Sequence, residues 1–146
     1  MRCSCSRFAS QLETFADVEA RIAATSELLP TLDEVASDSA KWLAILRCRV
    51  CSALWAKEYP FSERHGGGPV CLYQIPTCDP HAWLASNDGM THIIRERHED
   101  TMFFNSLGDE SGDAVCRNSD CSNKTTQHSV FCRLHHFEMI KGRPFR

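Results

Sequence analysis

The sequence lacks any apolar run that approaches the length of a membrane-spanning helix. Its first residues also lack the apolar stretch of a secretory signal or lipoprotein anchor, because Arg7, Gln11, Glu13 and Asp17 stand in that region. These absences favour a soluble, cytoplasmic protein with no membrane partner. The length of 146 residues, 42% of them hydrophobic, suits one modest core with a small appendage.

Patterns that accompany catalysis are also missing. The run Gly66, Gly67 and Gly68 is not followed by Lys-Ser or Lys-Thr, or by the start of a helix, so it is a poor candidate for a phosphate-binding loop. Ser62 and His65 lie three residues apart in one flexible loop, with no orienting acid or oxyanion hole indicated. We therefore expect that the protein is not an enzyme.

Cysteine, by contrast, is abundant. The chain has nine cysteines, an odd number, and they occur as C-x-C, C-x2-C and C-x4-C pairs beside histidines. Such spacing is typical of metal ligands in a reducing compartment, whereas a secreted disulfide framework usually has an even count. The cysteines therefore predict metal binding in the cytoplasm.

The strongest metal pattern is C-x4-C-x10-C-x2-H near the C-terminus. Its residues are Cys116, Cys121, Cys132 and His135, with His136 as the alternative fourth ligand. Two close pairs of thiolate or imidazole ligands separated by a short loop are typical of zinc. Four protein ligands leave no position for substrate, so we expect a structural zinc ion in a treble-clef-like module.

Helices are expected on both sides of a central strand-rich region. Leu12, Phe15, Val18 and Ile22 recur at helical spacing up to Pro30, and the capping-box spacing of Thr31 to Glu34 predicts a second short helix. Further helices are predicted after Asp79, from Met90 to Leu107, and from Cys132 to Gly142.

Three apolar runs, at 42–46, 53–59 and 70–75, predict antiparallel strands. The expected fold is α+β, with a small three-stranded antiparallel sheet packed by helices. We expect an α+β domain at 1–108, a linker at 109–113 and the zinc module at 114–146.

A second zinc site is predicted at the first strand turn. The end of the third strand would return to this edge of the sheet, so the preferred ligands are Cys48, Cys51, Cys78 and His81. In a competing assignment, Cys3 and Cys5 replace Cys78 and His81. A further alternative is that these cysteines are reduced and bind no metal. Cys71 would lie at the opposite end of the third strand, away from this site, as a small buried thiol.

The central segment carries a long motif. It contains Trp55, Tyr59, Pro60, Ser62, Glu63, His65, Gly66, Gly67, Gly68, Pro69 and Leu72. Over residues 30–85 the chain resembles the immunity protein 27 family, whose members are encoded beside toxins of bacterial polymorphic toxin systems. The resemblance implies a protein that binds and neutralises a cognate toxin domain. The turn with Cys48 and Cys51 departs from the family, which has an acidic, glycine-containing turn there, and the zinc tail lies outside the resemblance.

The glycine-rich loop also has a physical interpretation of its own. Consecutive glycines permit positive backbone torsions and close approach of another group, while Pro60 and Pro69 stiffen both ends. Glu63 and His65 are either exposed contacts or internal pins that bind glycine amides, and we favour the pins.

Charge is uneven along the chain. Residues 1–40 carry three basic and seven acidic side chains, which would suit a basic toxin partner, whereas residues 114–146 carry six basic and two acidic ones. A zinc-finger protein that binds nucleic acid through this tail is the alternative function. We do not favour it, because scattered cations without a stacking platform are typical of a solvated surface.

Overall fold

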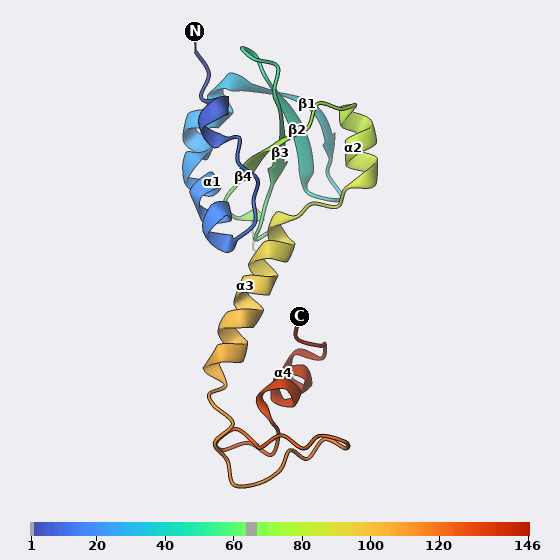
Figure 1. The fold of residues 1–146 in the computed structure, drawn as a ribbon. Helices are drawn as coiled ribbons and strands as arrows, with labels where there is room; N and C mark the ends of the chain where they lie inside the picture. The colour runs from blue at the N-terminus through green and yellow to red at the C-terminus, as the bar shows by residue number, and fades with distance from the viewer. Residues whose placement is uncertain (1, 64–66) are drawn as a thin grey trace. The chain divides into compact units, whose positions relative to one another are not determined.

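The computed structural model describes residues 2–63 and 67–146 (Figure 1). The chain divides into two compact units, Met1–Arg95 and Glu96–Arg146, which we describe separately. The first unit contains a four-stranded sheet with helices, so the predicted α+β class is confirmed.

The sheet is antiparallel throughout, with strand order β1-β2-β3-β4. Its strands are β1 (Leu32–Asp38), β2 (Leu43–Cys48), β3 (Leu54–Glu58) and β4 (Cys71–Ile75). The last three correspond to the predicted apolar runs. Sequential antiparallel strands need only short connections, and the tightest joins Asp38 to Leu43.

The first strand, β1, replaces the short helix predicted from Thr31. The hydroxyl of Thr31 donates a hydrogen bond to the carbonyl of Leu28 2.9 Å away, so it closes the preceding turn instead of capping a new helix. Leu32 and Ala36 are buried, and pairing with β2 continues through a register shift between Glu34 and Ala36. Pairing with a neighbouring strand outweighed the local capping signal.

Side chains alternate between the two faces of the sheet, as the period of a strand requires. On one face Leu46, Cys48, Trp55 and Leu72 pack with Leu28, the last residue of helix α1 (Phe15–Leu28). The opposite face has its own buried cluster, which contains Ile45, Leu54, Ala56, Tyr73, Ile75, Val18 and Leu84.

The helices of the first unit begin at identifiable caps. Helix α1 (Phe15–Leu28) starts at a capping box in which Thr14 and Asp17 exchange hydrogen bonds, and Pro30 follows its end in the 3-10 turn η2 (Leu29–Thr31). Helix α2 (Pro80–Ser86) has Asp79 as its N-cap and Pro80 at its first position, as predicted. A short 3-10 helix, η1 (Cys5–Phe8), precedes α1.

Helix α3 (Thr91–Ser106) crosses the boundary between the units, which therefore falls at Arg95 and Glu96 and not in the predicted linker at 109–113. The physical reason is aromatic packing, because Phe104 of α3 stacks on Phe145 with ring centroids 4.1 Å apart. Phe137 of α4 (Arg133–Lys141) is fully buried and contacts both rings. The second half of α3 thus belongs to the C-terminal core.

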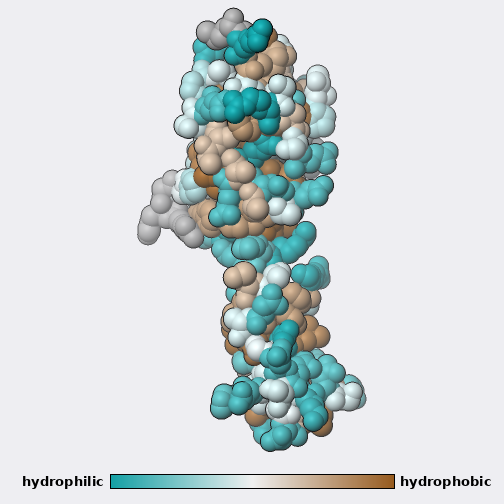
Figure 2. Space-filling model, turned by 60° about the vertical axis from the view of Figure 1, so that its left-hand side comes forward, coloured by the Kyte–Doolittle hydropathy of each residue, from teal (hydrophilic) through white to brown (hydrophobic). Residues whose placement is uncertain are grey.

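Hydrophobic and hydrophilic residues are interspersed on the surface of each unit on the face drawn in Figure 2. Single exposed apolar side chains are normal on protein surfaces, so a functional surface must be identified from a specific arrangement of groups.

Candidate metal centres and interaction surface

The four predicted C-terminal ligands come together. The Cys116, Cys121 and Cys132 sulfurs and a ring nitrogen of His135 all lie within 4.8 Å of one another. Nδ1 of His135 lies 3.3 Å from the sulfur of Cys116 and 3.2 Å from that of Cys132. Tetrahedral zinc with Zn–S bonds of about 2.3 Å separates its ligand atoms by roughly 3.7 Å, so the donor set fits such an ion.

Local structure explains this convergence. The amide of Cys116 donates to the carbonyl of Asn123 at 2.8 Å and closes the first ligand loop. Cys132 is the N-cap of α4, which places His135 in the first helical turn beside it. Both ligand pairs are therefore positioned by short-range backbone contacts that the spacing anticipated.

The geometry distinguishes the two adjacent histidines. His135 contributes its Nδ1 to the cluster, whereas His136 is outside it and uses its backbone amide to bind the carbonyl of Cys132. The ligand set with His135 is the one that the structure brings together.

The pKa values of the two buried thiols of the cluster, Cys116 and Cys132, shift in opposite directions. Burial opposes ionisation of Cys116, but backbone hydrogen bonds at Cys132 and Asn118 and a contact with His135 outweigh it and lower the pKa of Cys116 to about 6. Burial raises the pKa of Cys132, and the neighbouring thiols add to that rise. A cation at the centre would stabilise all the thiolates together.

The second thiol cluster differs from the preferred prediction. Its members are Cys3, Cys5, Cys48 and Cys51, whose sulfurs lie within 4.8 Å of one another. Cys78 and His81 do not join it, and both are exposed. The competing assignment with the N-terminal cysteines is therefore the one that the structure brings together.

The reason lies in the path of the chain after β4. Although Ile75 pairs with Leu54 beside the β2–β3 turn, the chain then enters α2, where Leu84 packs into the cluster on the sheet face opposite Cys48. The N-terminal segment occupies the face of Cys48 instead. The C-x-C spacing of Cys3 and Cys5 was the sequence signal for this arrangement. Cys71 is fully buried in the other cluster, as predicted, and burial raises its pKa to about 12.

The motif of the glycine-rich loop is described except for His65 and Gly66, which lie outside the described residues. Glu63 forms an ion pair with Arg95 of α3, and its side chain is 53% exposed. The predicted pinning of the glycine amides involves residues outside the described ones and stays a prediction. Ser62 donates its amide to Tyr59 at 3.0 Å, which makes a tight turn at the start of the loop.

Gly67 has the close approach that its sequence context predicts. Its φ is +79°, and a Cβ atom there would lie 2.7 Å from Cζ3 of Trp42. Trp42 itself has a φ of 54°, an uncommon torsion for a large residue, and its side chain is 47% exposed. The ring packs edge-on against Tyr59, with centroids 5.5 Å apart. The glycine loop therefore supports a tryptophan at the surface.

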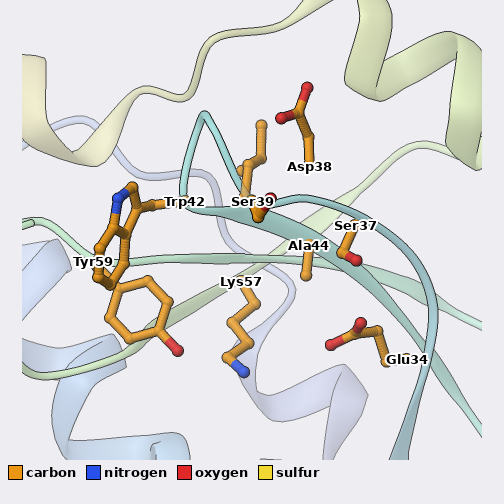
Figure 3. Close-up of a pocket in the computed structure, with 9 residues that line it drawn as sticks. Glu34, Ser37, Asp38, Ser39, Trp42, Ala44, Lys57 and Tyr59 are labelled. Atoms are coloured by element: carbon orange, nitrogen blue, oxygen red, sulfur yellow. The ribbon is translucent and has the colours of Figure 1, made fainter. Parts of the chain in front are cut away.

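Beside these two rings lies a cavity of about 340 Å³ (Figure 3). It is lined by Glu34, Ser37, Asp38, Ser39, Trp42, Leu43, Ala44, Lys57 and Tyr59. Figure 3 shows the two rings next to each other, with Glu34 beyond Lys57. Sequence reasoning missed this site, because Trp42 was assigned to the first predicted strand, at 42–46, whereas it precedes β2 and is exposed.

Comparison of the chain with models of protein families, with curated proteins and with solved structures finds no match. Within residues 2–63 and 67–146, no helix combines the length and apolar character needed to cross a membrane. The candidate functional features of the described residues are the two thiol clusters and the cavity at Trp42.

Proposed function

We propose that this protein is an immunity protein, which binds and neutralises a cognate toxin domain in the cytoplasm of the producing cell. The observation that carries the proposal is the open cavity at the exposed Trp42 and the half-buried Tyr59, two rings that Gly67 of the motif loop approaches closely. Such a protein needs no catalytic group, because it acts by covering or distorting the toxin active site.

Trp42 has the character of an interface anchor. Tryptophan and tyrosine are enriched among residues that dominate binding energy, and they contribute most when a partner covers them completely. An exposed tryptophan in a positive-φ turn has no core to stabilise, but its contacts with Tyr59 and Gly67 hold the ring in one orientation. A fixed ring loses little conformational entropy when a partner binds.

The cavity charges favour a basic partner. Glu34 is exposed at its rim, while Lys57 lies over the ring of Tyr59 at 5.7 Å. The adjacent Asp38 accepts the amide of Ala40 and contributes a second carboxylate. Together with the acidic composition of residues 1–40, this charge would accelerate capture of a basic toxin domain, such as a nuclease.

The C-terminal cluster is proposed to bind structural zinc. All four tetrahedral positions would be occupied by protein atoms, which leaves none for water or substrate. A small unit that has few buried side chains gains folding stability from a bound metal.

The alternative of nucleic-acid binding through the basic tail is weakened by intramolecular contacts of its cations. Arg143 pairs with the buried carboxylate of Asp100, and Arg133 binds Asp109 at 3.0 Å. Lys141 lies 4.9 Å from the centre of the Phe103 ring. These side chains are committed to the fold, which reduces the charge offered to phosphates.

The test is binding to the product of the adjacent upstream gene. We expect a stable complex that Trp42→Ala weakens by roughly tenfold or more, or about 1.4 kcal/mol, because a hot-spot ring is removed. Ile93→Ala is the matched control, since Ile93 is exposed to a similar extent, 45%, and lies outside the cavity. Absence of any complex, or salt-sensitive retention of nucleic acid instead, would contradict the proposal.

A further inference from the structure

Four free thiols from two separate segments of the chain lie close together. Cys3 and Cys5 come from the N-terminal segment, and Cys48 and Cys51 flank the turn between β2 and β3. One disulfide would need a single close pair, whereas all four sulfurs here lie within 4.8 Å of one another. Mutual proximity of four donors is the requirement of a tetrahedral metal site.

The turn that bears Cys48 and Cys51 is built to stabilise a thiolate. The amide of Val50 donates to the sulfur of Cys48 at 3.4 Å, and Ser52 turns the chain with a φ of 62°. Amide donors to sulfur are the outer contacts that orient and tune metal thiolates.

The buried indole of Trp55 also supports a metal site at these thiols. Trp55 is fully buried, and within the described residues its indole Nε1 has no hydrogen-bond partner of ordinary geometry. Cys5 and Cys48 belong to the same buried cluster as Trp55. A thiol is a weak acceptor, whereas a metal-bound thiolate at Cys5 would satisfy the indole.

We propose that Cys3, Cys5, Cys48 and Cys51 bind one zinc ion, which fastens the N-terminal segment over the Trp55 cluster. Thiolate ligands select zinc over hard cations such as magnesium and calcium, and four of them leave no open position, so the ion is structural. The inference concerns residues of the first unit and does not depend on the toxin partner.

The ion would add to the anchorage of the N-terminal segment. Helix η1 has no side-chain cap, but Ser4 bonds to Glu27 at 2.7 Å and Arg7 forms an ion pair with the same carboxylate. Cys5 is buried in the cluster with Trp55, and Arg21 lies over the ring of Phe8 at 5.5 Å. Loss of the metal would release this segment and admit water to the apolar cluster with Trp55. Trp55 is therefore a built-in reporter of the site.

The test uses the full chain, purified with zinc and analysed for metal per protomer. We expect two zinc ions in the wild type, one in Cys3→Ser/Cys5→Ser and two in Cys78→Ser, the matched control that removes an exposed thiol outside both clusters. Retention of two ions by the double variant, loss of one by Cys78→Ser, or iron in place of zinc would overturn the proposal.

A second measurement avoids dependence on folding of the variants. Cobalt added to the metal-free wild type should produce tetrathiolate absorption and quench tryptophan fluorescence, because a cobalt thiolate beside Trp55 accepts its excitation energy. The Trp55→Phe protein should show the absorption with most of the quenching lost. The peptide bond after Arg7 should become resistant to trypsin when the metal binds. Cobalt binding without quenching or protection would contradict the assignment.

Discussion

At the scale of single residues, Gly67 illustrates how a missing side chain makes room for a neighbouring one. Both Gly67 and Gly108 have a φ of +79°, but a Cβ at Gly67 would collide with Trp42, whereas one at Gly108 would meet nothing within 4 Å. Gly67 is thus required both by its backbone torsion and by the lack of space for a side chain, whereas Gly108 is required by its backbone torsion alone.

This pair gives a matched test. We expect Gly108→Ala to lower the free energy of unfolding by about 1 kcal/mol through backbone strain, and Gly67→Ala to lower it by about 2–3 kcal/mol because it also displaces Trp42. Denaturant unfolding measures both. In a Trp42→Ala background the excess cost at Gly67 should disappear. Equal costs at the two glycines would show that Trp42 does not pack on the loop in solution.

At the scale of elements, the start of α1 shows how a local motif produces both structure and pH dependence. The Asp17 carboxylate accepts the amide of Thr14 at 2.8 Å and that of Glu13 at 3.0 Å. These hydrogen bonds to the charged form lower the pKa of Asp17, with the Thr14 amide contributing most.

The sign of the pH effect follows from that shift. A carboxyl whose pKa is lower in the folded state stabilises the fold above its unfolded pKa of about 4, and this contribution is lost as pH falls through the folded pKa. Asp17→Ala should therefore destabilise the protein at pH 7, and the difference from the wild type should begin to shrink below about pH 4. Thermal unfolding at a series of pH values measures this difference. The control is Glu19→Ala, which removes an exposed acidic residue of the same helix. A difference that does not depend on pH would exclude the ionised cap.

Elements also show where local prediction fails. The caps at Asp79 and Gly142 were predictable, because a helix end is decided by contacts within a few residues. The capping-box spacing at Thr31 was misleading, since its segment pairs with β2. Strand formation depends on a partner elsewhere in the chain, which a local motif does not reveal.

At the scale of the whole molecule, the two units depend on different interactions. The first has a sheet with a buried cluster on each face, whereas the second has one aromatic core around Phe137 and the C-terminal thiol cluster. Removal of one C-terminal ligand should therefore affect the second unit selectively.

Cys121→Ser tests this selectivity. The variant is expected to lose one zinc ion and to become sensitive to proteases within Glu96–Arg146. All three tryptophans, Trp42, Trp55 and Trp83, belong to the first unit, so their fluorescence should keep the wild-type emission maximum. A red shift of that emission would mean that the units unfold together.

The sequence by itself determined the three cysteine ligands of the C-terminal cluster, the helix ends at Asp79 and Gly142, and three of the four strands. These features depend on residues close together in the chain, where spacing limits the geometry. Only the tertiary structure decided that Cys3 and Cys5 join Cys48 and Cys51, in place of Cys78 and His81. It also decided that Trp42 is exposed and packs against Gly67. Both outcomes depend on which segment covers which face of the sheet, and packing of the complete core decides that.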